Sequence, residues 1–368
     1  MDITQSRYFI KLSNETYIKK VLDGHPWLKD MTISSIPLPI KTDKDYIRNL
    51  EQAETPTTEE EQRKLQLQHG LNYRQAIGEL VYVMITCRPD ISFPLIKLSQ
   101  YSKNPASVHY DAVKQIFKYI EATMDDGIYY WRKEPRMDLP ILPIPQCKPD
   151  NYQSDNSTND TTQQLYSAVD SDWAGDSVHR KSVTGIALRL AGGTILYKTK
   201  FQDCVALSST EAEFTAACDA GKAILYVRSI LDEIGLEQNQ ATTLFIDNNG
   251  ALMMGNAQQP TRRTKHMDIK KLALQDWVQR DMIIMKRIKT TDNFADSLTK
   301  PMGRQLHYRH NDFLLGKHIP PYAEAIVKNC SLKAIESASQ PFSSQSLCST
   351  EHGGGKIPKG GESPDIPT

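Results

Sequence analysis

The 368-residue chain has 44 Lys plus Arg and 44 Asp plus Glu, so no overall basic charge indicates a nucleic-acid partner. Its 39% of hydrophobic residues suffice for globular cores, and its length allows two or three domains. No run of about 18 apolar residues occurs and the N-terminus is charged, so we expect a soluble, intracellular protein without a membrane partner. Six scattered cysteines without a C-x-x-C pair favour a reducing compartment and argue against a disulfide framework or zinc site.

Residues 1–133 predict a mostly helical domain. A short strand in RYFIKLS precedes an amphipathic helix, and residues 40–66 are polar enough to predict a loop. Three helices follow: one with apolar spacing from Tyr73 that ends at Pro89, one in ISFPLIKLSQYS, and one opened by Pro105. Residues 134–164 then turn to Pro, Ser, Asn and Thr, which predicts a linker or a disordered insertion.

Residues 165–315 predict an α/β domain. A strand leads into Asp170, a hairpin joins TGIALRL to TILYKT, and a long helix begins near Ser209 and stops at Gly235. A strand in TLFID, a basic helix over 264–280, a strand in MIIMKRI and a short helix complete an alternation typical of helices packed on a sheet. Residues 316–368 lose the apolar periodicity and predict a disordered tail.

Four carboxylates stand where such a domain could aim them into one pocket. Asp170 and Asp247 follow apolar runs at strand ends, whereas Glu213 and Asp296 lie in the first turns of helices. Each alone is more often a turn residue or a helix-dipole partner, and only the set of four outweighs that interpretation. Because clustered acids repel one another unless a cation neutralises them, the set implies Mg²⁺ or Mn²⁺ and suggests phosphodiester cleavage.

Neighbouring acids compete with two of these assignments. Asp172 lies two residues after Asp170 and shares its strand face, and Glu211 lies in the same first turn as Glu213, where it suits helix capping. The run Met124-Asp125-Asp126 resembles a polymerase motif, but it follows a helix and lacks flanking apolar strands. We therefore expect that run to form a helix-to-strand turn.

Several motifs in order resemble the Ty1/copia-type retrotransposon polyproteins. The family's ribonuclease H domain is matched over residues 165–315 by VDSDWAGD, RKSVTG, ALSSTEAEF, DNNGA, RTKHMDI and ADSLTKP. The thumb and connection region of its reverse transcriptase is matched upstream by YRQAIGELVYV, TCRPDI and NPASVH. The resemblance implies a ribonuclease H-like mixed sheet flanked by helices, preceded by a mostly helical thumb and connection domain.

The resemblance also implies a chemistry: cleavage of the RNA strand of an RNA/DNA hybrid with two Mg²⁺ ions, Mn²⁺ being an alternative. One ion would activate water and the other would stabilise the leaving oxygen, with Asp170, Glu213, Asp247 and Asp296 as the catalytic ligands. A basic stretch after Asp247 would track phosphates without reading sequence, although a lone His is more often structural. The expected substrate contacts are Asn248, Asn249, Arg262, Arg263, Lys265 and His266.

In the family, the polymerase Asp pair precedes the region matched by RYFIKLS. We therefore expect this chain to begin downstream of the polymerase site, with fingers and palm as a partner that the rest of the reverse transcriptase would supply. Two alternatives stay open: a catalytically silent fragment that binds nucleic acid or is merely structural, and an integrase-like strand transferase. The fourth carboxylate and the ADSLTK context speak against the strand transferase.

Overall fold

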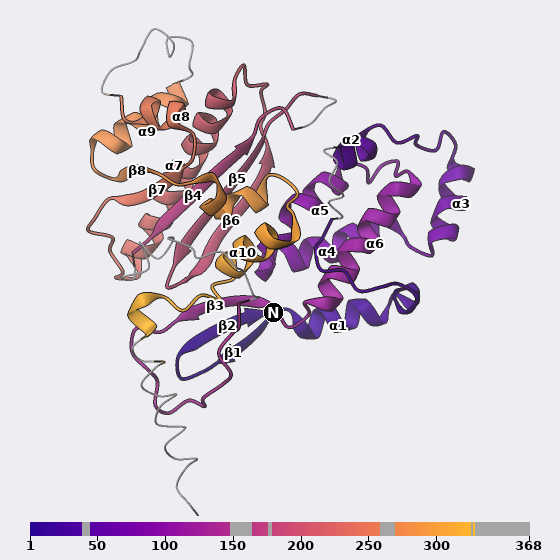
Figure 1. The fold of residues 1–368 in the computed structure, drawn as a ribbon, viewed down its shortest axis with the longest axis horizontal. Coiled ribbons are helices and arrows are strands. Elements are labelled where there is room, and N and C mark those ends of the chain that lie inside the picture. Colours follow the sequence, from indigo (N-terminus) through magenta and orange to yellow (C-terminus); the bar gives the residue numbers. More distant parts are fainter. Residues whose placement is uncertain (39–44, 148–163, 176–178, 258–268, 325–326, 328–368) are drawn as a thin grey trace, which may run out of the picture. The chain divides into compact units, whose positions relative to one another are not determined.

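The computed structural model of the chain describes residues 1–38, 45–147, 164–175, 179–257, 269–324 and 327 (Figure 1). Residues 1–327 form one compact unit. Two sheets organise this unit: a three-stranded sheet of order β1-β2-β3 and a five-stranded sheet of order β6-β5-β4-β7-β8.

The three-stranded sheet and the helices that follow β2 make up the first part of the chain. β1 (Asp2–Gln5), β2 (Phe9–Ser13) and β3 (Gly127–Trp131) pair antiparallel. The predicted strand in RYFIKLS and the helix after it are confirmed, whereas β1 was not expected. The helical elements between β2 and β3 are α1 (Glu15–Asp23), η1 (Pro26–Asp30), α2 (Asp45–Glu51), α3 (Glu59–His69), α4 (Tyr73–Cys87), η2 (Pro89–Ile91), α5 (Ser92–Ser99) and α6 (Ser107–Ala122).

The loop predicted for residues 40–66 is wrong for the part that the structure describes, because this stretch holds α2 and most of α3. Thr58 and Glu61 form a capping box, in which the Thr58 side chain accepts a hydrogen bond from the Glu61 backbone N–H at 3.2 Å. A Thr followed three residues later by a Glu is a sequence pattern that predicts the start of a helix. The polar composition concealed it, since α3 is a largely exposed helix with few apolar side chains to reveal its period.

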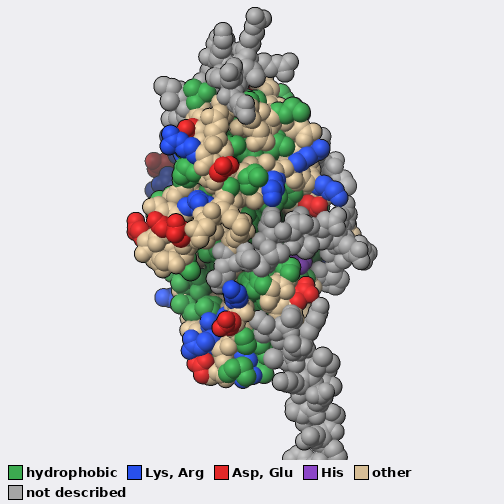
Figure 2. Space-filling view, turned by 90° about the vertical axis from the view of Figure 1, so that its left-hand side faces the viewer, with side chains coloured by type: hydrophobic (Ala, Val, Ile, Leu, Met, Phe, Trp, Pro, Cys, Tyr) green, Lys and Arg blue, Asp and Glu red, His purple; other side chains and the backbone are tan. Residues whose placement is uncertain are grey.

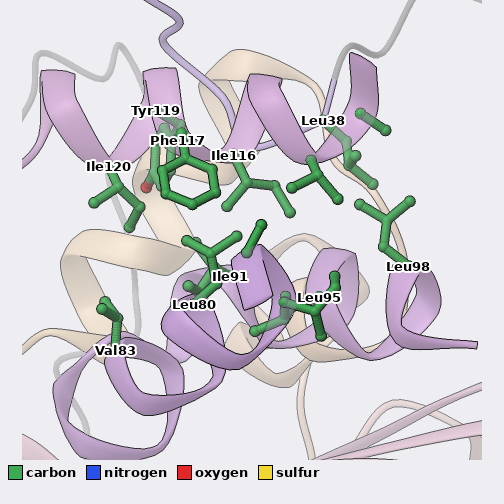
Figure 3. Close-up of a cluster of buried hydrophobic side chains, with 14 of the residues drawn as sticks. Leu38, Leu80, Val83, Ile91, Leu95, Leu98, Ile116, Phe117, Tyr119 and Ile120 are labelled. Carbon is green, nitrogen blue, oxygen red and sulfur yellow. The ribbon is translucent and has the colours of Figure 1, made fainter. Parts of the chain in front are cut away.

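Apolar side chains of α4, α5 and α6 form the core of this helical part (Figure 3). Leu80, Leu95 and Ile116 are each at most 1% exposed and belong to the same cluster. Burying such side chains contributes roughly 1.5–3 kcal/mol each. The three helices predicted from periodicity are therefore confirmed, and their apolar faces meet one another.

The five-stranded sheet is mixed, as expected. β5 pairs antiparallel with both β4 and β6, while β4 pairs parallel with β7 and β7 pairs parallel with β8. Its elements are β4 (Tyr166–Asp172), β5 (Val183–Leu190), β6 (Gly193–Phe201), α7 (Ser209–Glu233), β7 (Thr242–Ile246), α8 (Asn249–Gly255), α9 (Ile269–Gln279), β8 (Ile283–Arg287), η5 (Thr290–Asp292), η6 (Phe294–Leu298) and α10 (Arg304–Leu314).

Two apolar layers cover the two faces of this sheet. On one face Val169 and Leu244 pack in a cluster with Phe214 of α7. On the other, Ala168 packs in a cluster with Phe294 of η6 and with α10. Because side chains alternate along a strand, Asp170 lies on the same face as Ala168, toward η6. The arrangement is therefore the predicted one: a mixed sheet flanked by helices, preceded by a mostly helical part.

Buried polar contacts tie the helical part to α10. Tyr119 of α6 donates a hydrogen bond to Asp90 of η2 at 2.6 Å, and its hydroxyl lies 2.9 Å from His307 Nε2 and 3.2 Å from Asn311 Nδ2. All four side chains are at most 3% exposed. The predicted domain boundaries at 133/134 and 164/165 stay a proposal, but residues on both sides of them share this network.

The predicted helix-to-strand turn at Met124-Asp125-Asp126 is confirmed, since α6 ends at Ala122 and β3 begins at Gly127. Asp126 is buried and forms an ion pair with Lys317, which also lies 3.3 Å from Asp312. The packed region thus continues beyond residue 315, where the predicted tail begins. Most of that tail (325–326 and 328–368) and linker residues 148–163 lie outside the described residues. No described helix has the length and hydropathy needed to span a membrane.

Candidate metal centre

Asp170 and Asp247 meet where two adjacent parallel strands separate. β4 and β7 are paired only from Tyr166 to Ala168 on the β4 side, so the strands are no longer hydrogen-bonded where Asp170 lies. Asp247 directly follows β7. A crevice beyond the carboxyl ends of neighbouring parallel strands is a common ligand site in α/β sheets. Strand pairing alone therefore places two of the four predicted carboxylates at one such crevice.

Glu213 enters the site from α7. The helix begins at Ser209, as predicted, but its cap is Ser208 and not Ser209 or Thr210, the two caps that the sequence suggested. The Ser208 side chain accepts a hydrogen bond from the Glu211 N–H at 3.2 Å. The Glu213 side chain reaches β4, where its Oε1 accepts a hydrogen bond from the Ser171 N–H at 3.0 Å. This contact fixes the carboxylate beside the strand that carries Asp170.

Asp296 lies in η6, a short 3₁₀ helix, where the sequence predicts a short helix. Asn293 caps η6 and donates a buried hydrogen bond to the Val169 carbonyl at 3.0 Å, which holds η6 against β4. Thr299, just after η6, donates to the Asp170 carboxylate. Gly185 faces Asp170 in the β4–β5 register, and a Cβ there would lie 2.6 Å from the Thr299 methyl carbon. The glycine of the RKSVTG motif therefore permits η6 to approach the sheet this closely.

The carboxylates are close together and buried. One oxygen from each of Asp170, Glu213 and Asp247 lies within 4.8 Å of the other two. Asp170, Glu213 and Asp296 are 2–4% exposed. Burial, followed by the charge of Asp170, raises the pKa of Glu213, of Asp247 and of Asp296 above the ordinary range. Such a cluster is stable in its ionised form only with added positive charge.

Two carboxylate oxygens of this cluster are placed to bind such a positive charge. Glu213 Oε2 and Asp296 Oδ1 are buried and have no hydrogen-bond partner among the described residues. A buried, unpartnered carboxylate oxygen is costly unless a cation binds it. Because every donor atom is a carboxylate oxygen, the group fits a hard divalent ion such as Mg²⁺ or Mn²⁺.

Lys300 contacts this cluster and was not among the predicted site residues. Its Nζ lies 3.0 Å from Asp296 Oδ2 and 3.6 Å from Asp170 Oδ2. Burial by itself lowers the pKa of the Lys300 ammonium, but the charges of Asp170 and Asp296 outweigh it and raise the pKa above its ordinary value. The lysine is therefore positively charged. The sequence did contain one signal for Lys300. It lies four residues after Asp296 in ADSLTKP, a spacing that allows an ion pair within a helix.

The two rival acids occupy other positions. Glu211 Oε2 accepts a hydrogen bond from the Leu207 N–H at 2.9 Å, as expected for a helix-capping residue. Asp172 lies at the end of β4, where its carboxylate packs so closely on Gly175 that a Cβ there would meet Asp172 Oδ2 at 2.1 Å. Burial raises the pKa of Asp172 to about 6. Neither acid belongs to the 4.8 Å group of Asp170, Glu213 and Asp247.

The predicted substrate contacts are only partly placed. Asn248 caps α8 through a hydrogen bond from the Ala251 N–H at 3.0 Å, and Asn249 is exposed at the start of that helix. Lys/Arg and Asp/Glu side chains of described residues intermingle on the face in Figure 2, as the zero net charge leads one to expect. The four basic candidates lie outside the described residues: Arg262, Arg263, Lys265 and His266.

Most of the chain is similar in sequence to retrotransposon polyproteins. It is 31% identical over 293 residues to the Retrovirus-related Pol polyprotein from transposon TNT 1-94 of Nicotiana tabacum, covering 80% of this chain and 19% of that polyprotein. It is 29% identical over 232 residues to the Retrovirus-related Pol polyprotein from transposon RE2 of Arabidopsis thaliana, covering 63% of this chain and 14% of that polyprotein. The chain thus spans less than a fifth of the length of these relatives.

No protein-family model matches the chain. Among solved structures, LC11-RNase H1 isolated from compost aligns at 11% identity with a TM-score of 0.30, covering 38% of this chain and 94% of that one.

Proposed function

We propose that this chain, which is similar over most of its length to copia-type retrotransposon Pol polyproteins, is the ribonuclease H of such a polyprotein, a metal-dependent endonuclease that cleaves the RNA strand of RNA/DNA hybrids. One observation carries the proposal: the buried carboxylates of Asp170, Glu213 and Asp296 and the half-buried one of Asp247 gather where β4 and β7 separate, and two of their oxygens lack a hydrogen-bond partner among the described residues. The substrate is proposed from the similarity to these polyproteins, and the reaction class from the carboxylates.

The donor set supports Mg²⁺, with Mn²⁺ as the alternative, as the cofactor. Asp170, Glu213 and Asp247 would hold one ion, since their oxygens lie within 4.8 Å of one another. Asp296 would share a second ion with Asp170, because both contact the same lysine ammonium. When bound, the ions would activate a water molecule and stabilise the leaving oxygen.

The chain's own residues have the task of holding these ligands still. Thr299 fixes Asp170, the Ser171 N–H fixes Glu213, and Thr290 donates to Asp247 Oδ2 at 2.9 Å. Asn293 anchors the segment that carries Asp296 to β4. Rigid ligands matter because small displacements from the reactive geometry are costly in rate. The sequence-independent grip on the hybrid is proposed to come from Arg262, Arg263, Lys265 and His266, with Asn248 and Asn249 beside Asp247.

The full chain tests this function on a hybrid whose RNA strand is end-labelled, with Mg²⁺ or with EDTA. We expect metal-dependent cleavage of the RNA strand that the variant Asp247→Asn loses by a factor of at least about 10². Asp232→Asn is the matched control, since Asp232 is an exposed acid of α7. Equal activity in Asp247→Asn and wild type would contradict the proposed metal site.

Other outcomes distinguish the remaining possibilities. Binding of the hybrid without cleavage in Mg²⁺ or in Mn²⁺ would identify a catalytically silent fragment. Joining or nicking of DNA duplex ends, with intact hybrid, would identify an integrase-like strand transferase. The polymerase fingers and palm, proposed as a partner, are tested by adding them: primer extension should require them and should not depend on Asp247.

A further inference from the structure

We propose that Lys300 is a tethered cation that competes with one divalent ion for Asp170 and Asp296, so that the centre binds its two ions unequally. The inference rests on the proposed function, because it concerns the same carboxylates. It adds a residue and a regulatory consequence: the second ion binds only when the lysine side chain withdraws.

Lys300 forms ion pairs with Asp296 and with Asp170, and Asp170 is one member of the group of three. Its Nζ lies 3.0 Å from Asp296 Oδ2 and 3.6 Å from Asp170 Oδ2, whereas the oxygens within 4.8 Å of one another belong to Asp170, Glu213 and Asp247. The first ion can therefore use the group of three without displacing the lysine. A second ion shared by Asp170 and Asp296 would need the oxygens that the ammonium contacts.

Lys300 is held but not enclosed. Its side chain is 35% exposed, whereas the carboxylates it contacts are at most 5% exposed. Its backbone is fixed, because the Lys300 N–H donates to the Asp296 carbonyl at 3.2 Å. The flexible four-carbon stem can thus carry the ammonium into solvent while the loop stays in place.

Charge makes the competition specific to the second ion. With four ionised carboxylates and Lys300 in place, one divalent ion leaves a formal charge of minus one, and a second reverses it to plus one. Without the lysine charge, the second ion brings the centre to neutrality. Lys300 should therefore weaken the second site far more than the first, since like charges about 4 Å apart repel strongly at a partly buried site.

Manganese titration of the full chain tests this, with free Mn²⁺ measured by electron paramagnetic resonance. Wild type should bind one ion tightly and a second weakly. Lys300→Met should tighten the weak site by about tenfold or more and leave the tight site nearly unchanged. Lys300→Arg keeps the charge and should behave as wild type. Lys222→Met is the matched control, because Lys222 also pairs with a carboxylate, Asp219, at 3.1 Å on the surface of α7.

A second readout needs no metal. In EDTA, Lys300→Met should melt at a lower temperature than wild type and Lys222→Met, because the four acids lose their cation. If Lys300→Met fails to fold, Lys300→Gln takes its place, and the wild-type titration still tests the inequality of the two sites. Two equal sites in wild type would overturn this inference but not the proposed function. A weak site whose affinity Lys300→Met or Lys300→Gln leaves unchanged would do the same. No Mn²⁺ binding by wild type would overturn the proposed function with it.

Discussion

Arg88 lies at the centre of the buried network that connects the helical part to α10, and Arg88→Met tests how much that network stabilises the fold. The guanidinium is 0% exposed and donates to Asp90 Oδ1 at 2.9 Å and Oδ2 at 2.7 Å, and to the Thr123 carbonyl at 2.9 Å and hydroxyl at 2.7 Å. Methionine fills a similar volume without any donor. Asp90, itself 2% exposed, would keep, among the described residues, only the hydrogen bond from Tyr119.

The expected cost follows from the charge left behind. Breaking a buried ion pair by removing one partner typically costs about 3–5 kcal/mol, because the remaining charge is uncompensated. Replacing both partners by apolar side chains is often nearly neutral. We therefore expect Arg88→Met to lower the free energy of unfolding by about 3–5 kcal/mol, and Arg88→Met/Asp90→Leu to recover most of this loss.

Urea denaturation of the full chain at pH 7, followed by tryptophan fluorescence and circular dichroism, measures both effects.

Repeating the measurement at lower pH tests the direction in which the cost of Arg88→Met changes with pH. Burial raises the pKa of Asp90, but Arg88 outweighs burial and holds that pKa below its ordinary value. Without Arg88 the carboxyl should take up a proton more readily, so the cost of Arg88→Met should shrink as the pH falls. A cost below about 1 kcal/mol, or a double variant as unstable as Arg88→Met, would refute the reasoning.

Other predictions concern the close approach of η6 and the pH dependence of stability. Gly185→Ala should lower stability by about 1–3 kcal/mol and reduce hybrid cleavage, because its Cβ would lie 2.6 Å from the Thr299 methyl carbon. Gly78→Ala, in the exposed part of α4 with nothing within 4 Å of the new Cβ, should instead stabilise by up to about 1 kcal/mol in the same denaturation assay. Burial, aided by the neighbouring charges, lowers the pKa of His310 to about 3 from 6.5, so its contribution is complete above pH 6.5 and is lost as the pH falls. Between pH 7.5 and 5 this loss should reach roughly 2 kcal/mol, and His310→Gln should flatten that part of the stability profile; an unchanged slope would contradict the assignment.

Much of the fold was readable because local pattern and tertiary environment agree. α4 and α6 bury the faces that their 3.6-residue period indicates, and the hairpin of β5 and β6 forms where the turn residues predict it. The loop prediction at residues 40–66 failed because a polar, exposed helix has no apolar period, and only its capping box announces it.

For the candidate metal centre too, the sequence predicted some features and not others. Residue type and motif order singled out Asp170, Glu213, Asp247 and Asp296, since four acids at element ends need a cation whatever their exact geometry. Capping by Glu211 is likewise a local property, set by the first turn of α7. These features depend on neighbours in the chain, which a sequence displays directly.

Only the tertiary structure decided the features that depend on segments far apart in the chain. The loss of pairing between β4 and β7 after Ala168 opens the crevice, and Gly185 lets η6 approach the sheet. The network around Tyr119 joins η2 to α10, although about two hundred residues separate them in sequence. The contact of Lys300 with Asp170 arises in the same way, because an ion pair depends on distance in space, which the sequence does not state.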